Sequence, residues 1–242
     1  MIAGLLTALY SFYNAVFQPV LGMGPYVALG FFSVCLANLF SVIRWWLLDH
    51  EKAEKIQDKI SKKQEKMKEA RENDNHEKAS EHTKEVFKHN QKFMMLNMKP
   101  MIGTMVFVAL IFPWLGTTFA PAVQLQQTNG QMYEGNFTYA GTQTPITVDN
   151  STETPVLGYG NQTVEPGQAV NINGFDWTYK GIKEKTPGFF SSTDGTVAEF
   201  NGKFVTLPFS LPFIGGALNW LGFYILIAMP LTFALNKALG IQ

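Results

Sequence analysis

Three polar side chains, Asn38, Ser41 and Arg44, recur at steps of three within and at the end of an otherwise apolar stretch. On a helix, steps of three stay close to one face, so these side chains would form a polar stripe. Polar and charged groups inside a membrane are costly and face a protein interior or water. The stripe therefore predicts a hydrophilic groove that is open to the cytoplasm and keeps polar groups solvated inside the membrane. For Arg44 alone, a side chain that snorkels to the lipid headgroups is the alternative.

Further polar residues lie within or beside the later apolar stretches, and we expect them to line the same groove. They are Thr104, Asn219, Thr232 and Asn236. Hydrogen bonds between helices, worth about 0.6 kcal/mol each, are the alternative explanation for these residues.

Methionines crowd the region where the second apolar stretch begins. They are Met94, Met95, Met98, Met101 and Met105. Flexible, polarizable thioethers suit a surface that accepts varied apolar partners. The cluster therefore predicts contact with a hydrophobic client, although ordinary packing between helices would produce the same stripe.

Catalytic chemistry has little support in this sequence. The apolar stretches contain no His, Asp or Glu, and neither a GxSxG nor an HExxH sequence occurs in the chain. An intramembrane hydrolase would need such bases and nucleophiles. Cys35 is the single cysteine, which excludes an internal disulfide, and no Cys/His cluster has metal-ligand spacing. We expect no enzyme activity, no cofactor and no metal.

The elements that carry these residues are predicted to be membrane helices. The uncharged stretches Gly24–Ile43, Met101–Val123 and Leu211–Leu235 each reach the roughly 20 residues that cross a bilayer core. The fold class is therefore membrane α-helical. The expected boundaries are a first transmembrane helix at 22–48, a second at 99–120, a third at 209–237 and a tail at 238–242.

Charge distribution predicts the orientation. The segment from Arg44 to Lys99 holds 14 of the 19 basic residues and 11 of the 19 acidic ones, a net charge of +3. Short basic loops resist translocation. We therefore expect a multi-pass protein of the plasma membrane, with the N-terminus outside and this segment and the C-terminus in the cytoplasm.

Residues 49–98 predict an antiparallel coiled-coil hairpin. Apolar positions advance by four and three in its first half and by seven in its second half, on either side of a polar turn. They are Ile56, Ile60, Met67 and Ala70, with the stem of Lys63, and then Ala79, Val86 and Phe93. A docking arm is the functional interpretation, and a solvated spacer is the alternative.

Residues 1–21 predict an amphipathic interfacial helix on the outer face. Apolar residues such as Leu5, Phe12 and Val16 fall at helical spacing, with Asn14 across from them. A cleaved signal peptide is disfavoured, because the segment has no positively charged start.

Residues 121–208 predict an inserted extracellular β-rich domain, separate from the helices and dispensable to them. Alternating polarity and glycine dipeptides indicate strands and tight turns, at Asn173-Gly174, Asp194-Gly195 and Asn201-Gly202. From 120 to 212, four lysines face eight acids, a net charge of −4. Possible glycosylation sites in N-x-S/T sequons are Asn136, Asn150 and Asn161.

The order of these segments resembles that of the archaeal YidC-like proteins, a family first catalogued as a domain of unknown function within the YidC/Oxa/Alb insertase superfamily. The resemblance covers residues 1 to about 118 and 208–242. It rests on the following residues: Phe17-Gln18-Pro19-Val20, Asp49 before the Lys/Glu segment, Lys99-Pro100-Met101, Trp114-Leu115-Gly116, Trp220-Leu221-Gly222-Phe223-Tyr224 and Leu239-Gly240-Ile241.

This resemblance implies an insertase that passes client segments laterally into the bilayer without nucleotide. In the superfamily, three core helices form a hydrophilic groove, and a cytoplasmic coiled coil receives the client. Arg44 is the only counterpart of the groove arginine of bacterial members, and it lies nearer the cytoplasmic end. The implied partners are nascent hydrophobic segments, the lipid bilayer, a ribosome or targeting factor at the coil and a small membrane subunit, with no specific nucleic acid. A surface receptor or structural protein with a ligand-binding β domain is the competing function.

Overall fold

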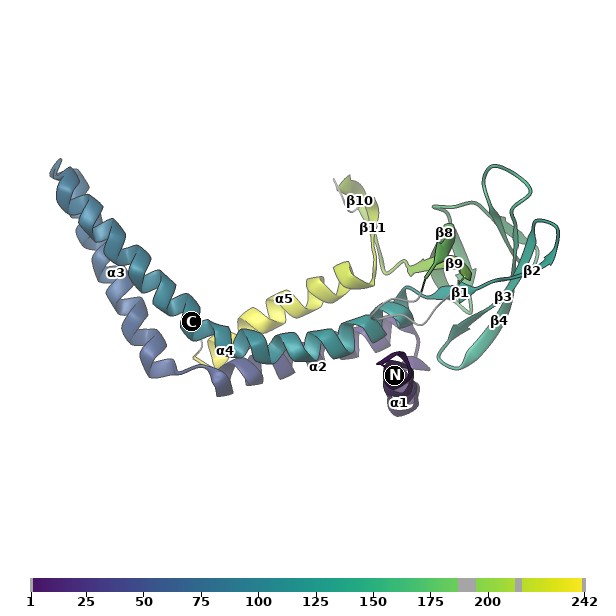
Figure 1. Cartoon of the computed structure of the whole chain (residues 1–242), viewed down its shortest axis with the longest axis horizontal. Helices are drawn as coiled ribbons and strands as arrows, with labels where there is room; N and C mark the ends of the chain where they lie inside the picture. The colour runs from purple at the N-terminus through teal and green to yellow at the C-terminus, as the bar shows by residue number, and fades with distance from the viewer. Residues whose placement is uncertain (1, 187–194, 212–214, 241–242) are drawn as a thin grey trace. The chain divides into compact units, whose positions relative to one another are not determined.

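The computed structural model describes residues 2–186, 195–211 and 215–240 of the chain. Its helices are α1 (Ile2–Leu21), α2 (Pro25–Leu47), α3 (His50–Glu72), α4 (His76–Phe119) and α5 (Trp220–Ala238) (Figure 1). Its strands are β1 (Ala122–Gln124), β2 (Gln126–Asn129), β3 (Met132–Tyr139), β4 (Thr142–Asp149), β5 (Val156–Tyr159), β6 (Gln162–Val164), β7 (Ala169–Ile172), β8 (Phe175–Lys185), β9 (Gly195–Gly202), β10 (Val205–Leu211) and β11 (Gly215–Leu218).

These elements divide into two compact units. Unit 1 consists of Met1–Cys35 and Leu110–Pro230, and it contains α1 and all the strands named above. Unit 2 consists of Leu36–Ala109 and Leu231–Gln242, and it contains α3 and most of α4. The helices α2, α4 and α5 contribute residues to both units.

Among the described residues, α2, α4 and α5 are long and apolar enough to cross a membrane. The 44 residues of α4 rise about 66 Å at 1.5 Å per residue, more than twice a bilayer core. Its first half is charged and its second half is apolar, so one uninterrupted helix serves both the hairpin and a span.

The third span differs from the sequence prediction. Helix α5 begins at Trp220, whereas the predicted span began at residue 209. The described residues before α5 form the antiparallel ribbon of β10 and β11, in which Val205 faces Leu218 and Thr206 faces Ala217. Pro208, Pro212 and a Gly-Gly pair explain the error, because these residues disfavour a helix however apolar the segment is.

Helix α3 and the first half of α4 form an antiparallel hairpin. The Asp49 side chain caps α3 by accepting a hydrogen bond from the Lys52 N–H at 3.1 Å, and the pKa of that carboxyl is lowered chiefly by its hydrogen bonds with Lys52. Thr83 donates to the Met67 sulfur at 3.3 Å, and Lys63 forms a salt bridge with Glu85. Met67 follows Lys63 along α3, but its partner Thr83 precedes Glu85, the partner of Lys63, along α4. The two helices therefore run in opposite directions.

The less exposed side chains of the hairpin follow alternating steps of three and four. On α3 they are Ala53, Ile56, Ile60, Lys63, Met67 and Ala70, and on α4 they are Ala79, His82, Val86, His89, Phe93 and Leu96. The sequence prediction named most of these positions. It omitted Ala53 and Leu96, and it omitted the two histidines because a histidine carries no apolar signal in a periodicity search.

Helix α1 packs on α4 and α2 through aromatic rings. The Trp114 ring, 1% exposed, lies 5.3 Å from Tyr13, 5.6 Å from Phe17 and 5.2 Å from Phe32, centroid to centroid. Its indole Nε1–H donates to the Asn14 side-chain oxygen at 2.9 Å. The prediction placed Asn14 on a polar face without a partner on another helix. The structure instead uses Asn14 to hold α1 against α4.

The strands of unit 1 form two larger antiparallel sheets, with strand orders β1-β9-β8-β7 and β2-β3-β4-β5-β6 (Figure 1). Side chains from both sheets meet in one core, where the Phe137 ring of β3 lies 5.0 Å from Trp177 of β8 and 5.1 Å from Phe200 of β9. The β-rich prediction for this part of the chain is confirmed.

Two of the three predicted glycine turns lie in described residues. Asn173 and Gly174 both have positive φ, 54° and 83°, and they join β7 to β8 in a two-residue turn as predicted. Asn201 and Gly202 were predicted as a turn, and that prediction is wrong, because both are paired within β9. A Cβ on Gly202 would lie 2.8 Å from the Phe204 ring, so close packing requires this glycine. Asp194 lies outside the described residues.

The β strands do not form a compact unit of their own, which differs from the prediction of a separate module. The Phe204 ring lies 5.6 Å from Tyr26 at the start of α2, 5.7 Å from Phe119 at the end of α4 and 5.2 Å from Phe223 near the start of α5. It also lies 5.1 Å from Phe175 of β8. These rings, named the aromatic hub below, join the strands to the ends of three helices.

Candidate functional site

The polar stripe of α2 lies partly at the surface of unit 2 and partly inside it. Asn38 is exposed, Arg44 is half-buried and Ser41 is 1% exposed. Within the part of the chain that the structure describes, the Ser41 Oγ has no hydrogen-bond partner. A buried hydroxyl without a partner costs about 1–3 kcal/mol, and either a water molecule or rotation of the hydroxyl onto a main-chain carbonyl of α2 would remove this cost.

Asn236 of α5 presents the same problem in the same unit. Its Oδ1 is buried and unpaired among the described residues, and Thr232, one turn earlier, is half-buried. Nearly all buried polar atoms in proteins have partners, so these two oxygens call for an explanation, as do the unpaired buried atoms of unit 1 among the described residues. Water entering from the end of the helices would satisfy both.

Two other residues of the predicted groove have different partners. Thr104 Oγ1 donates to the Met101 carbonyl oxygen of its own helix at 2.9 Å, so its hydroxyl is already satisfied. Asn219 precedes α5 in unit 1, and its Oδ1 accepts the Gly222 N–H at 2.9 Å. Asn219 is therefore the N-cap of α5. Its place in the groove stays a prediction, and its capping role was missed because the predicted span was started too early.

A glycine brings α2 and α4 together in unit 2. A Cβ on Gly103 would lie 2.7 Å from the Leu47 side chain and 3.3 Å from Ile43. In a membrane, the hydrophobic effect does not drive helices together, because lipid tails are as apolar as the side chains. Small residues let two helices approach closely and gain van der Waals contact instead. This contact fixes one face of α2 against α4. Positions 38, 42 and 46 lie away from that face and are exposed.

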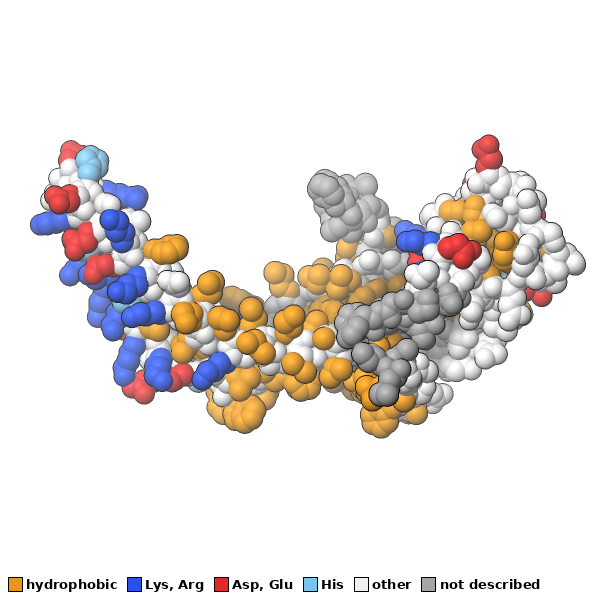
Figure 2. Space-filling model, viewed as in Figure 1, with side chains coloured by type: hydrophobic (Ala, Val, Ile, Leu, Met, Phe, Trp, Pro, Cys, Tyr) orange, Lys and Arg blue, Asp and Glu red, His pale blue; other side chains and the backbone are white. Residues whose placement is uncertain are grey.

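The methionine cluster is solvent- or lipid-accessible along its length. The exposed fractions are 65% for Met94, 61% for Met95, 44% for Met98, 61% for Met101 and 67% for Met105. Packing between helices would have buried these side chains, so the structure favours an open apolar surface on α4. Figure 2 shows hydrophobic side chains gathered over the helical part beside the charged hairpin.

A polar cavity of about 440 Å³ lies at the base of the hairpin in unit 2. Its lining includes His50, Glu54 and Asp58 of α3, together with Gly240 after α5. Leu48 and Ala53 are buried beside it, and Phe93 and Leu96 pack against them. No local sequence pattern indicates this cavity, because the position of Gly240 near α3 depends on the fold.

The comparison with protein families decides the classification. The family model of integral membrane proteins described as EMC3/TMCO1-like matches residues 14–147, just over half of the chain. The chain belongs to the EMC3/TMCO1-like family. This family is related to membrane-protein insertases and falls broadly within the Oxa1/YidC/Alb3 superfamily. The superfamily resemblance is therefore confirmed, while the specifically archaeal branch is not singled out. No curated protein and no solved structure gives a significant match.

The EMC3/TMCO1-like match includes α2, α3, α4 and the first strands through most of β4. The predicted groove residues of α2 and the methionine cluster of α4 therefore lie inside the family region. Thr232 and Asn236 lie outside it. The chain is an integral membrane protein with three candidate spans among the described residues.

The predicted glycosylation sites all lie in the β region of unit 1. Asn136 on β3 and Asn161 after β5 are exposed, and Asn150 after β4 is half-buried. Asn161 lies in the two-residue turn between Tyr159 and Gln162. The first and last sequons therefore present the accessible side chains that a glycan needs.

Proposed function

We propose that this EMC3/TMCO1-like protein inserts hydrophobic segments of client proteins into the membrane. The observation that carries the proposal lies in unit 2: the buried oxygens of Ser41 and Asn236 have no hydrogen-bond partner among the described residues, and α4 carries an exposed methionine surface. The polar atoms call for water inside the unit, and the methionines suit an apolar client. An insertase needs both properties.

The physical role of the groove is to reduce a desolvation barrier. A client segment carries polar backbone and flanking groups that cost several kcal/mol each when they enter hydrocarbon unpaired. Water and polar side chains at Asn38, Ser41 and Arg44 would keep those groups solvated while the apolar part of the segment reaches lipid. No nucleotide or catalytic residue is needed for this transfer.

The orientation proposed from the positive-inside rule places the hairpin in the cytoplasm, with the N-terminus and the β region outside a plasma membrane. The charged hairpin then meets a ribosome or a targeting factor, and exposed parts of the spans remain for a small membrane subunit. The sequons at Asn136, Asn150 and Asn161 would face the glycosylating side in this orientation.

Reconstitution tests the proposed activity. The full chain is placed in liposomes, and a single-span model protein is translated in their presence. We expect protease-protected client in these liposomes above the level in empty liposomes. Arg44→Ala should lower insertion, and Arg44→Lys should retain most of it if the charge matters more than the guanidinium fork. Equal protection with and without the protein would contradict the proposal.

The receptor alternative requires a different test from excision of the β region. The aromatic hub joins β8 and the Phe204 segment to α2, α4 and α5, so excision would disturb the helices as well. Substitutions confined to the exposed surface of the β region are the better test. An insertase should keep its activity in such variants, whereas a receptor should lose its function.

A further inference from the structure

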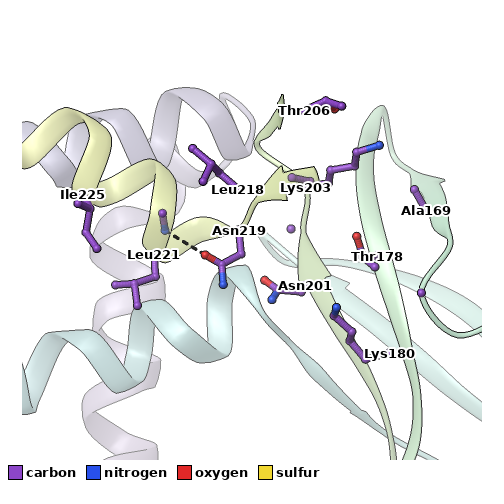
Figure 3. Close-up of a pocket in the computed structure, with 14 residues that line it drawn as sticks. Ala169, Thr178, Lys180, Asn201, Lys203, Thr206, Leu218, Asn219, Leu221 and Ile225 are labelled. Carbon is purple, nitrogen blue, oxygen red and sulfur yellow. Dashed lines mark hydrogen bonds between the residues drawn. The ribbon is translucent and has the colours of Figure 1, made fainter. Parts of the chain in front are cut away.

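A second cavity lies in unit 1, where the β region meets the start of α5. Its volume is about 640 Å³, within the roughly 300–1,000 Å³ range of small-molecule sites. The strands β8 and β9 supply its polar side, including Thr178, Lys180 and Asn201, and Lys203 follows β9. The first turns of α5 supply Leu221 and Ile225 on the opposite side (Figure 3).

The charge of this cavity is opposite to that of its surroundings. Residues 120–212 contain only four lysines against eight acids, yet two of those lysines, Lys180 and Lys203, line this cavity. Within the described residues neither of them forms a salt bridge, whereas Lys185 on the same strand pairs with Glu199 at 2.7 Å. In Figure 3 the Lys180 amino group ends near Asn201, whereas Lys203 extends away from it, so Lys180 is the direct anion ligand and Lys203 adds to the positive charge of the cavity.

The cavity also has an unpaired acceptor and an apolar wall. The Asn201 Oδ1 is buried and has no hydrogen-bond partner among the described residues. A buried acceptor of this kind calls for a donor such as a hydroxyl group. Leu218, Leu221 and Ile225 line the other side, and the last two belong to a helix apolar enough to span a membrane. Asn219, the cap of that helix, also lines the cavity (Figure 3).

We propose that this cavity binds the headgroup of an anionic phospholipid that carries hydroxyl groups, of which phosphatidylglycerol is the simplest. The Lys180 ammonium group holds the phosphate, the Lys203 ammonium group adds positive charge at the cavity, and the Asn201 amide, which lines the cavity, pairs with a headgroup hydroxyl. The acyl chains leave along Leu221 and Ile225 into the bilayer that α5 crosses. The apolar wall favours a lipid over a free phosphate ion, although both present the same anion. The proposal does not depend on insertase activity.

Lipid retention tests this site in the full chain. The protein is purified from nanodiscs of equal parts phosphatidylglycerol and phosphatidylcholine, and the lipid that stays bound is identified by native mass spectrometry. We expect phosphatidylglycerol to be retained selectively. Each lysine near a membrane surface is worth about 1 kcal/mol toward anionic lipid, so Lys180→Gln with Lys203→Gln should weaken retention roughly 30-fold, since 1.4 kcal/mol corresponds to a factor of ten.

Lys183→Gln is the matched control, because Lys183 is an exposed lysine on the same strand and does not line the cavity. It should leave retention unchanged. Asn201→Val should reduce the preference for phosphatidylglycerol over phosphatidic acid, which keeps the phosphate but lacks the glycerol headgroup. Equal retention of both nanodisc lipids, or no loss in the double variant, would overturn the proposal. Displacement of the lipid by millimolar inorganic phosphate alone would overturn the lipid assignment in favour of a free anion.

Discussion

Replacing Phe204 by Ala should separate the β region from the helix ends. The Phe204 ring is 3% exposed and lies within 6 Å of four other rings, on Tyr26, Phe119, Phe175 and Phe223. Truncation of a buried Phe to Ala costs about 3–5 kcal/mol, including the cavity that it leaves. Each kcal/mol shifts the melting temperature of a region of this size by roughly 2–4 °C, so the expected loss is roughly 6–20 °C.

The assay is thermal unfolding of the full chain in nanodiscs, followed by near-ultraviolet circular dichroism of the aromatic residues. Tyr133→Ala serves as the control, because Tyr133 is a half-buried aromatic of the β region that has no ring contact with the hub. Limited proteolysis after residue 119 should be faster in Phe204→Ala than in the control. A Phe204→Ala protein that melts and resists protease like the original would refute the structural coupling of strands and helices.

Other consequences of the structure are open to direct measurement. Gly103→Val should weaken the contact of α4 with α2 and lower the melting temperature in nanodiscs, whereas Gly30→Val, where a Cβ meets nothing within 4 Å, should not. The pKa of Glu85 lies below its ordinary value of 4.5, chiefly through the hydrogen bond from Lys63. The hairpin should therefore lose stability as pH falls below about 4.5, seen as a wider spread of spin-label distances across it, and Lys63→Ala should weaken this dependence. Burial raises the pKa of Tyr179 from 10.0 to about 12. The β region should therefore lose stability as pH rises from 10 to 12, because the unfolded chain ionises first, and Tyr179→Phe should remove this component of an alkaline melting curve.

Local patterns in the sequence predicted those parts of the fold that local forces decide. Uncharged length identified the first two spans, and the Asn173-Gly174 dipeptide identified a turn because its backbone needs positive φ. The same arguments failed where tertiary packing decides the secondary structure or the residue type at a position. Apolar length did not distinguish the β10–β11 ribbon from the start of α5. The glycine at 202 is required by the Phe204 ring and not by a turn.

The candidate site was predictable to a similar extent. Helical spacing placed Asn38, Ser41 and Arg44 on one helix surface, but only the fold shows that Ser41 is buried without a partner. The exposure of the methionines also depends on which helix covers them. The cavity of about 640 Å³ in unit 1 brings together residues from several strands and a helix that no local pattern links.

Site-specific photocrosslinking from position 38 tests the insertase proposal most directly. A photoreactive residue replaces Asn38, which is exposed on α2, and a stalled membrane-protein client is translated in the presence of the reconstituted chain. Phe40 provides the control position, two residues on and roughly 200° around the helix. Leu36 would be a poorer control, because it is only 5% exposed. We predict strong client crosslinks from position 38 that depend on the apolar segment of the client, and weak ones from position 40. Equal crosslinking from both positions, or none from position 38 while insertion proceeds, would contradict a groove on this face of α2.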